Sequence, residues 1–159
     1  MREIGTITAE EAYRKAAACC AASEQCAADI RKRMERWGLD AACQQTVVAR
    51  LEKEKFIDET RYARCFVRDK FRYNGWGRVK MAQALRLKGI SPSCIEKAMD
   101  EIEEEEYSRT LQKLLQSKAR TLKGGTDYER NGKLVRFGLS RGFEMPLIMR
   151  MLHVEEDFA

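Results

Sequence analysis

The sequence predicts an all-α protein built from three consecutive three-helix units. Strong helix formers such as alanine, leucine, glutamate, lysine and arginine are abundant, and the chain contains only two prolines. No stretch alternates between apolar and polar residues for long enough to predict a β-strand. A glycine followed by an apolar residue also recurs at nearly constant spacing, which is typical of a repeated structural unit.

Helix starts are marked by residues whose side chains can accept hydrogen bonds from the free N–H groups of a first turn. Two capping boxes begin at Thr8 and Thr126, each with a glutamate three residues later. Single N-caps are predicted at Ser23, Asp40, Asp58 and Ser91. Helix ends are predicted at Gly38, Gly75, Gly89, Gly124 and Gly142. Together these signals predict nine helices, at 9–22, 24–37, 40–55, 59–74, 76–88, 92–103, 104–122, 127–141 and 145–152.

Three of these glycines divide the nine helices into groups of three. Gly38, Gly89 and Gly142 are 51 and 53 positions apart, and each precedes an apolar residue. The residues eight positions earlier, where a helix would face a core, are Ile30, Met81 and Leu134. Any junction of helix, glycine and helix resembles this pattern, but the constant spacing favours a repeat. We therefore predict units at 1–55, 56–103 and 104–159, each burying an apolar face partly against its neighbour.

Positive charge is concentrated in the middle of the chain. The net charge is +5, but residues 61–95 carry nine basic groups and one acidic group, whereas residues 96–106 are strongly acidic. Arginines at 61, 64, 68 and 72 follow helical spacing and share one face. Two interpretations remain open: a solvated face whose charges pair with the acidic segment, or a docking surface for phosphates or an acidic protein. Trp76 is expected to be a core residue rather than one that stacks on bases.

The sequence contains no set of residues that would support catalysis or metal binding. The six cysteines are Cys19, Cys20, Cys26, Cys43, Cys65 and Cys94. None has C-x-x-C spacing and His153 is isolated, so we expect free thiols, no metal and no cofactor. The longest apolar stretch, residues 16–22, is far shorter than the roughly 20 residues of a membrane helix. With no export signal recognised, a cytoplasmic protein is expected.

The centre of the chain resembles the RecX family. Phe56-Ile57-Asp58-Glu59-Thr60-Arg61-Tyr62-Ala63 with Phe66 is similar to the family signature F-[IL]-[DN]-[DE]-x-R-[YF]-A-x-x-[FW]. The stretch from Gly75-Trp76-Gly77-Arg78 to Lys88-Gly89-Ile90-Ser91 resembles the next element, a glycine-containing turn that leads into a basic helix. The similarity is specific over residues 55–100. It is looser over 20–54, where Cys26 replaces the usual serine, and weak after 105.

The resemblance implies a fold and a function. The fold would be three tandem three-helix repeats that form an elongated, curved body. The function would be binding along the groove of a RecA–DNA filament, with suppression of ATP hydrolysis, strand exchange and filament growth. Some family members also contact DNA, and none has catalytic residues. The alternative from another class is a general DNA-binding helical module that acts without RecA.

From the charge pattern we predict the residues that contact the filament. They are Arg61, Arg64, Arg68, Lys70, Arg72, Arg78 and Lys80. Arg61 has a second interpretation, because it follows the Asp58 cap and could form an internal ion pair that fixes the helix start. We expect the protein to bind the RecA filament as a monomer.

Overall fold

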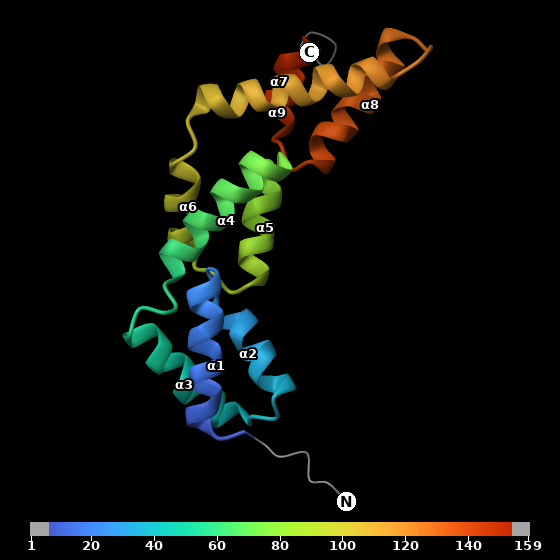
Figure 1. Cartoon of the computed structure of the whole chain (residues 1–159). Coiled ribbons are helices and arrows are strands. Elements are labelled where there is room, and N and C mark those ends of the chain that lie inside the picture. Colours follow the sequence, from blue (N-terminus) through green and yellow to red (C-terminus); the bar gives the residue numbers. More distant parts are fainter. Residues whose placement is uncertain (1–6, 154–159) are drawn as a thin grey trace, which may run out of the picture.

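The computed structural model describes residues 7–153, and within them the chain folds into nine α-helices without a β-strand (Figure 1). The helices are α1 (Ala9–Ala22), α2 (Ala27–Arg36), α3 (Ala41–Lys53), α4 (Glu59–Asn74), α5 (Arg78–Leu87), α6 (Pro92–Asp100), α7 (Glu104–Thr121), α8 (Asp127–Ser140) and α9 (Met145–Leu152). In this part of the chain, no helix has both the length and the apolar character needed to span a bilayer. The all-α prediction is confirmed.

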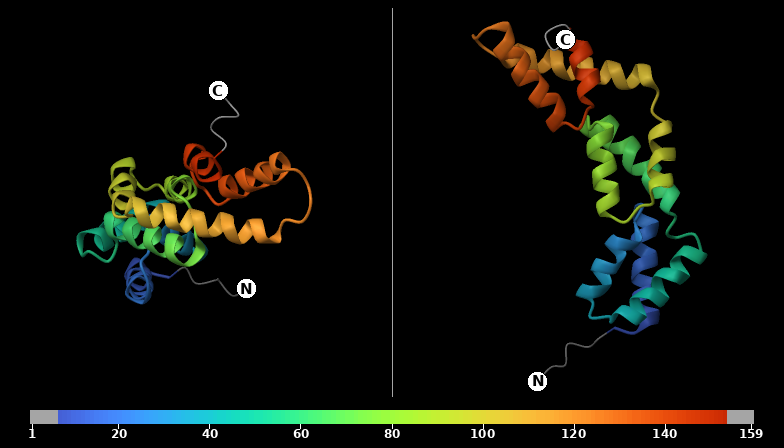
Figure 2. Two further views of the ribbon diagram at one scale, coloured as in Figure 1. Left: turned by 90° about the horizontal axis from the view of Figure 1, so that it is seen from above. Right: turned by 180° about the vertical axis from the view of Figure 1, so that it is seen from behind.

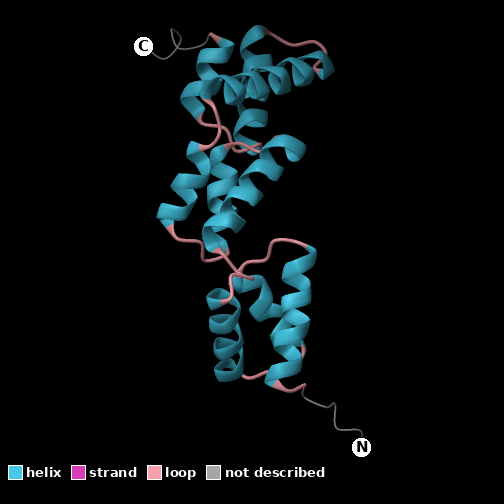
Figure 3. Ribbon diagram, turned by 60° about the vertical axis from the view of Figure 1, so that its left-hand side comes forward, coloured by secondary structure: helices cyan, strands magenta, loops and turns pink. Residues whose placement is uncertain are grey.

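The helices pack in three groups of three. Helix α3 contacts α1 and α2, α4 contacts α5 and α6, and α8 contacts α7 and α9. The three groups follow one another along an elongated, curved body, with α1 to α3 at one end and α7 to α9 at the other (Figure 2). Loops connect successive helices throughout (Figure 3). The division at 1–55, 56–103 and 104–159 stays a prediction, and its terminal residues 1–6 and 154–159 lie outside the described part.

Most predicted caps are present in the structure. Thr8, Asp40, Asp58, Ser91 and Thr126 each accept a hydrogen bond from the N–H three residues later. Ser23 was wrongly predicted to cap the second helix. It ends α1 instead, and α2 starts four residues later, after Cys26, which makes no side-chain cap hydrogen bond. The residues between Ser23 and Ala27 form the connection from α1 to α2. Within this connection, Cys26 is buried in the core that contains residues of α4 and α5 rather than in the core of its own unit.

The three repeat glycines occupy equivalent positions, as their spacing predicted. Gly38, Gly89 and Gly142 all have left-handed φ angles, of 84°, 77° and 93°. After each glycine, the N–H of the next residue donates to the carbonyl five residues earlier over 3.1 Å. This 6→1 bond is the Schellman motif, which satisfies a carbonyl that the helix end leaves free. The residues after the glycines are Leu39, Ile90 and Phe143, and all three are buried.

The nine helices share two hydrophobic cores rather than three. The first core lies within α1 to α3 and the loop after them, and it includes Ile30, Met34 and Leu51. The second core extends through α4 to α9. Tyr107 of α7 joins its two halves, since the Tyr107 ring lies 5.9 Å from the ring of Phe71 and 5.0 Å from that of Phe143. The second and third units therefore pack as one body.

Candidate partner-binding surface

Three of the predicted arginines form an exposed face on α4. Arg64, Arg68 and Arg72 are spaced by one helical turn, so their side chains follow one another along the helix. They line one wall of a shallow groove of about 220 Å³, and Glu101 and Glu106 line the other. Arg64 Nε lies 2.7 Å from Glu101 Oε1, in a pair whose side chains are about half exposed. The acidic segment thus neutralises one of these arginines, whereas Arg68 and Arg72 have no ion pair within residues 7–153.

Arg61 lies in the joint between the first and second units. Its Nε pairs with the Glu24 carboxylate, and its Nη2 donates to the carbonyls of Lys55 and Phe56 over 3.1 and 3.2 Å. The hydrogen bond that Arg61 donates to the Glu24 carboxylate raises the pKa of the Arg61 guanidinium. These contacts match the internal ion pair that the sequence allowed for Arg61. They leave its guanidinium engaged within the protein.

Arg78 is held in the joint between the second and third units. Its guanidinium pairs with Glu104 at 2.5 Å and Glu144 at 3.0 Å, and it lies 3.8 Å from the centre of the Tyr107 ring. The backbone N–H of Arg78 also donates to the Tyr107 hydroxyl over 3.0 Å. Arg78 is therefore separate from the exposed arginines of α4.

Lys70 and Lys80 lie apart from the arginine face. Lys70 is two residues from both Arg68 and Arg72, which places it roughly 200° around the helix from each. The ammonium groups of Lys70 and Lys80 lie 4.9 and 4.5 Å from the centre of the Trp76 ring. Trp76 is only half-buried and contacts Phe66 edge-on, so the core prediction for Trp76 holds for part of the ring. The predicted cationic surface is therefore two surfaces, the arginine face (Arg64, Arg68, Arg72) and the lysine cluster (Lys70, Trp76, Lys80).

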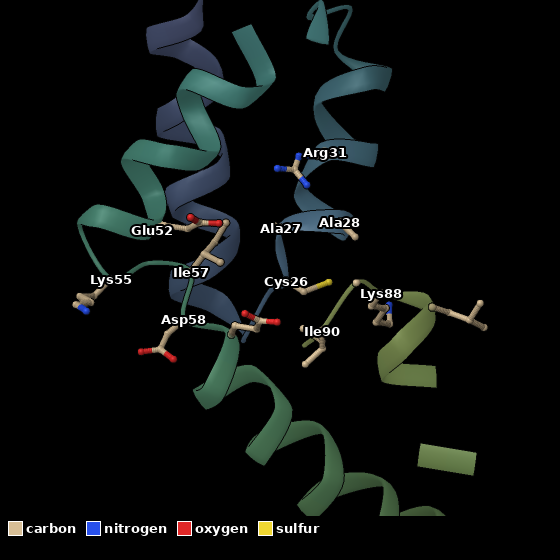
Figure 4. A pocket seen from close by; sticks show the side chains of 13 residues that line it. Cys26, Ala27, Ala28, Arg31, Glu52, Lys55, Ile57, Asp58, Lys88 and Ile90 are labelled. Carbon is tan, nitrogen blue, oxygen red and sulfur yellow. The ribbon is translucent and has the colours of Figure 1, made fainter. Parts of the chain in front are cut away.

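A pocket of about 550 Å³ lies between the first and second units, and the sequence did not predict it (Figure 4). Cys26, which precedes α2, and Ala28 of α2 face Lys88 and Ile90 of the α5–α6 turn across it. Lys88 Nζ donates to both carboxylate oxygens of Asp29 over 2.9 and 3.0 Å. Burial by itself would raise the pKa of the Asp29 carboxyl, but hydrogen bonds from Lys88 and the Cys26 thiol lower it on balance. No sequence signal joins Asp29 to Lys88, because 59 positions separate them.

Comparisons with known proteins identify the family. A model of the second three-helix domain of RecX matches residues 58–99, and a model of the third three-helix domain of RecX matches residues 104–152. Together these models cover more than half of the chain, and the chain belongs to the RecX family. The matched regions contain α4, α5 and all but the last residue of α6, and then α7 to α9.

Individual relatives agree with the family models. The regulatory protein RecX of Clostridium botulinum (strain Eklund 17B / Type B) is 29% identical over 75% of this chain and 56% of its own length. The chain thus spans about half the length of the first curated relatives that it matches, with 42% for the protein of Oceanobacillus iheyensis. A crystal structure of RecX from Lactobacillus salivarius superposes with a TM-score of 0.80 at 16% identity, over 95% of this chain and 97% of that one. Another crystal structure, of a regulatory protein RecX, gives 0.84 at 22% identity, over 92% and 73%. Both structures have the same fold.

Proposed function

We propose that this protein regulates the RecA recombinase by binding the RecA–DNA filament in the bacterial cytoplasm. It would act as a monomer that suppresses ATP hydrolysis, strand exchange and filament growth without catalysing a reaction itself. The observation that carries the proposal is membership of a family of regulatory proteins, through two domain models that match most of α4 to α9. An elongated, curved body suits a partner that is itself a long helical polymer.

We assign the contact with the filament to the arginine face. Arg68 and Arg72 are exposed and have no acidic partner within 4 Å among residues 7–153, so their guanidinium groups are available for charge-assisted hydrogen bonds. Arg61 and Arg78 are removed from this assignment, because both are engaged in the joints between units. Substituting either of them would test stability rather than binding.

The groove beside the arginine face favours a protein partner. Glu101 and Glu106 line the wall opposite the arginines, and their carboxylates would repel a phosphate placed in the groove. A protein surface can match both signs of charge, with its own carboxylates at Arg68 and Arg72 and a basic or polar group near Glu106. We therefore expect this face to contact RecA subunits rather than the DNA within the filament.

The test reverses the charge of all three arginines of the arginine face together. The variant R64E/R68E/R72E should lose inhibition of the single-stranded-DNA-dependent ATPase of its cognate RecA. The concentration needed for half-inhibition should rise about tenfold or more, which corresponds to at least roughly 1.4 kcal/mol of binding free energy. Circular dichroism and thermal unfolding would establish that the variant is folded. If it is not, R64Q/R68Q/R72Q replaces it in the same ATPase assay.

A matched control separates a specific surface from general loss of positive charge. K32E/R36E/K53E makes the same change in net charge on exposed residues of the first unit that have no ion pair among the described residues. This control should inhibit the ATPase nearly as well as the parent protein. Full inhibition by the folded arginine variant would place the contact elsewhere. If binding to bare DNA equals binding to the filament, the protein is instead a DNA-binding module that acts without RecA.

A further inference from the structure

The lysine cluster is a second charged feature, which the assignment of the arginine face leaves unused. Lys70 belongs to α4, Lys80 belongs to α5, and both ammonium groups lie within 5 Å of the centre of one indole ring. We propose that Lys70, Trp76 and Lys80 form a binding site for the phosphodiester backbone of nucleic acid. The inference rests on the proposed function for its setting, since the strand bound would be the one within the filament.

The ammonium groups of both lysines lie against one indole ring. Neither Nζ lies within 4 Å of a carboxylate in the described part of the chain. Asp69 is next to Lys70 in sequence and lines the same groove as Lys70, but it is exposed and forms no ion pair with it. Each ammonium is attracted to the face of Trp76, but the two repel each other. A strand that carries successive phosphates would place one against each ammonium group and relieve that repulsion.

The backbone beneath the cluster is firmly held. The N–H of Gly77 donates to the carbonyl of Arg141 over 2.7 Å, next to Trp76. The first turn of α5 packs against the α8–α9 turn so closely that a Cβ placed on Gly142 would lie 2.3 Å from the Cβ of Lys80. Because the turn is fixed and the indole holds both lysine side chains, binding costs little additional conformational entropy. A site that is organised before its ligand arrives is typical of recognition rather than of a solvated surface.

A phosphate fits this cluster better than a protein carboxylate does. Lysine ammonium groups bind phosphate oxygens as compact point charges, and a nucleic-acid strand offers a separate phosphate to each of the two lysines. The half-buried indole adds an exposed aromatic surface on which a base or sugar next to the phosphate can pack. Because Lys70 and the arginines lie on different sides of α4, the helix would contact RecA on one side and nucleic acid on the other.

The experiment uses Trp76 as its own probe in the absence of RecA. The chain has two tryptophans, so Trp37→Phe leaves Trp76 as the only source of indole fluorescence. This variant is titrated with oligothymidylate and with a DNA duplex of equal phosphate number, at several salt concentrations. Saturable quenching of Trp76 is expected with at least one of the two DNAs, and their relative affinities show which form of backbone the site prefers.

Removing the two charges should change the salt dependence in a defined way. For single strands, K70Q/K80Q in the same background should make the negative slope of log K against log salt less steep by about 1.4, since each phosphate contact contributes about 0.7. K32Q/K53Q removes two exposed charges from the first unit and should leave the slope unchanged. Unchanged Trp76 fluorescence with both DNAs, or an unchanged slope for the folded K70Q/K80Q, would overturn the proposal. Quenching by polyglutamate that equals quenching by DNA would do the same and would indicate an acidic protein ligand.

The two proposals can fail separately. The titration contains no RecA, so it does not depend on whether the protein inhibits the RecA ATPase. Loss of ATPase inhibition in the arginine variant with normal quenching of Trp76 supports both assignments. Full ATPase inhibition by that variant contradicts the arginine face alone, and absence of quenching contradicts the lysine cluster alone.

Discussion

Two glycines face each other where the second and third units meet, and neither has room for a methyl group. A Cβ on Gly77 would lie 2.3 Å from the carbonyl carbon and oxygen of Gly142. The close approach lets the N–H of Val79 donate to the Gly142 carbonyl over 2.9 Å. The free N–H groups at the start of α5 are therefore satisfied by the neighbouring unit rather than by a capping side chain.

We predict that Gly77→Ala destabilises the protein by about 3 kcal/mol, because the added methyl group meets backbone atoms that cannot rotate away. The φ angle of Gly77 is −82°, so steric overlap and not backbone strain causes the loss. Chemical denaturation measures the free energy of unfolding. Gly132→Ala is the control: Gly132 lies in α8 with open space around it, and alanine there should stabilise the helix by about 0.5–1 kcal/mol. Equal effects of the two substitutions would contradict the close packing of the joint.

The elements of this protein are joined in two different ways. Between the second and third units, backbone hydrogen bonds and the packed rings of Phe71, Tyr107 and Phe143 form most of the joint, together with the ion pairs of Arg78. Between the first and second units, the joint is made largely of side-chain ion pairs, with Lys88 bound to Asp29 beside the pocket. Ion pairs of this kind depend on pH and salt, whereas backbone contacts and stacked rings do not. The joint between the first and second units should therefore respond more strongly to pH and salt than the joint between the second and third units.

We predict that the stabilisation supplied by Asp29 disappears in acid. The pKa of its carboxyl is lowered in the folded protein from an ordinary value of 3.8. A carboxyl whose pKa is lowered on folding adds stability above its unfolded pKa and loses it as the pH falls through the folded pKa. The difference in unfolding free energy between the parent and D29N should be about 0.5–1 kcal/mol at neutral pH. It should shrink below about pH 3.8, as measured by urea unfolding.

A double-mutant cycle with K88Q isolates the Lys88 contact from the other role of Asp29. Asp29 lies in the first turn of α2, where any carboxylate is favoured by the helix dipole. D29N in the K88Q background should therefore cost less than D29N alone, with a coupling energy of about 0.5–1 kcal/mol. A coupling energy of zero would mean that Asp29 acts only through its helix.

At the scale of the whole molecule, the nine helices of residues 7–153 are divided unequally between two hydrophobic cores. The first core belongs to α1 to α3 and the loop after them, and the second belongs to α4 to α9 together with Cys26 and Ala28 at the start of α2. A three-helix unit of this size buries little apolar surface, so its stability by itself is small. The first unit should therefore open more readily than the rest of the molecule.

We predict that matched core substitutions affect different parts of the chain. Leu51 and Leu111 are both fully buried, Leu51 in the first core and Leu111 in the second. L51A should accelerate amide hydrogen exchange in α1 to α3 while α4 to α9 remain protected. L111A should accelerate exchange across α4 to α9 together, and each substitution should cost about 2–5 kcal/mol in its own core. Equal acceleration in all nine helices by L51A would show that the chain unfolds as one cooperative unit.

Much of the fold could be predicted from the sequence, because its signals act over short distances. A cap at Asp40 or Thr126 bonds an N–H three residues away, and a glycine such as Gly89 closes its turn within six residues. Helical spacing likewise predicted that Arg64, Arg68 and Arg72 would share a face. The cap predicted at Ser23 was wrong because burial of Cys26 in the second core, a long-range contact, determines where α2 begins.

The sequence by itself determined the nine helices of residues 7–153 and the helix face on which the arginines lie, since each follows from interactions within a few residues. The grouping of the helices in threes was predicted from a longer signal, the near-constant spacing of Gly38, Gly89 and Gly142. Only the tertiary structure decided which cations remain available. Arg61 pairs with a residue 37 positions away and Arg78 with residues 26 and 66 positions away, so neither pairing could be predicted from local spacing. It also decided that Lys70 and Lys80 meet at Trp76, because α4 and α5 place them there by packing against each other. The physical reason is range: a cap is satisfied within one turn of helix, whereas an ion pair or a shared core depends on how distant segments pack.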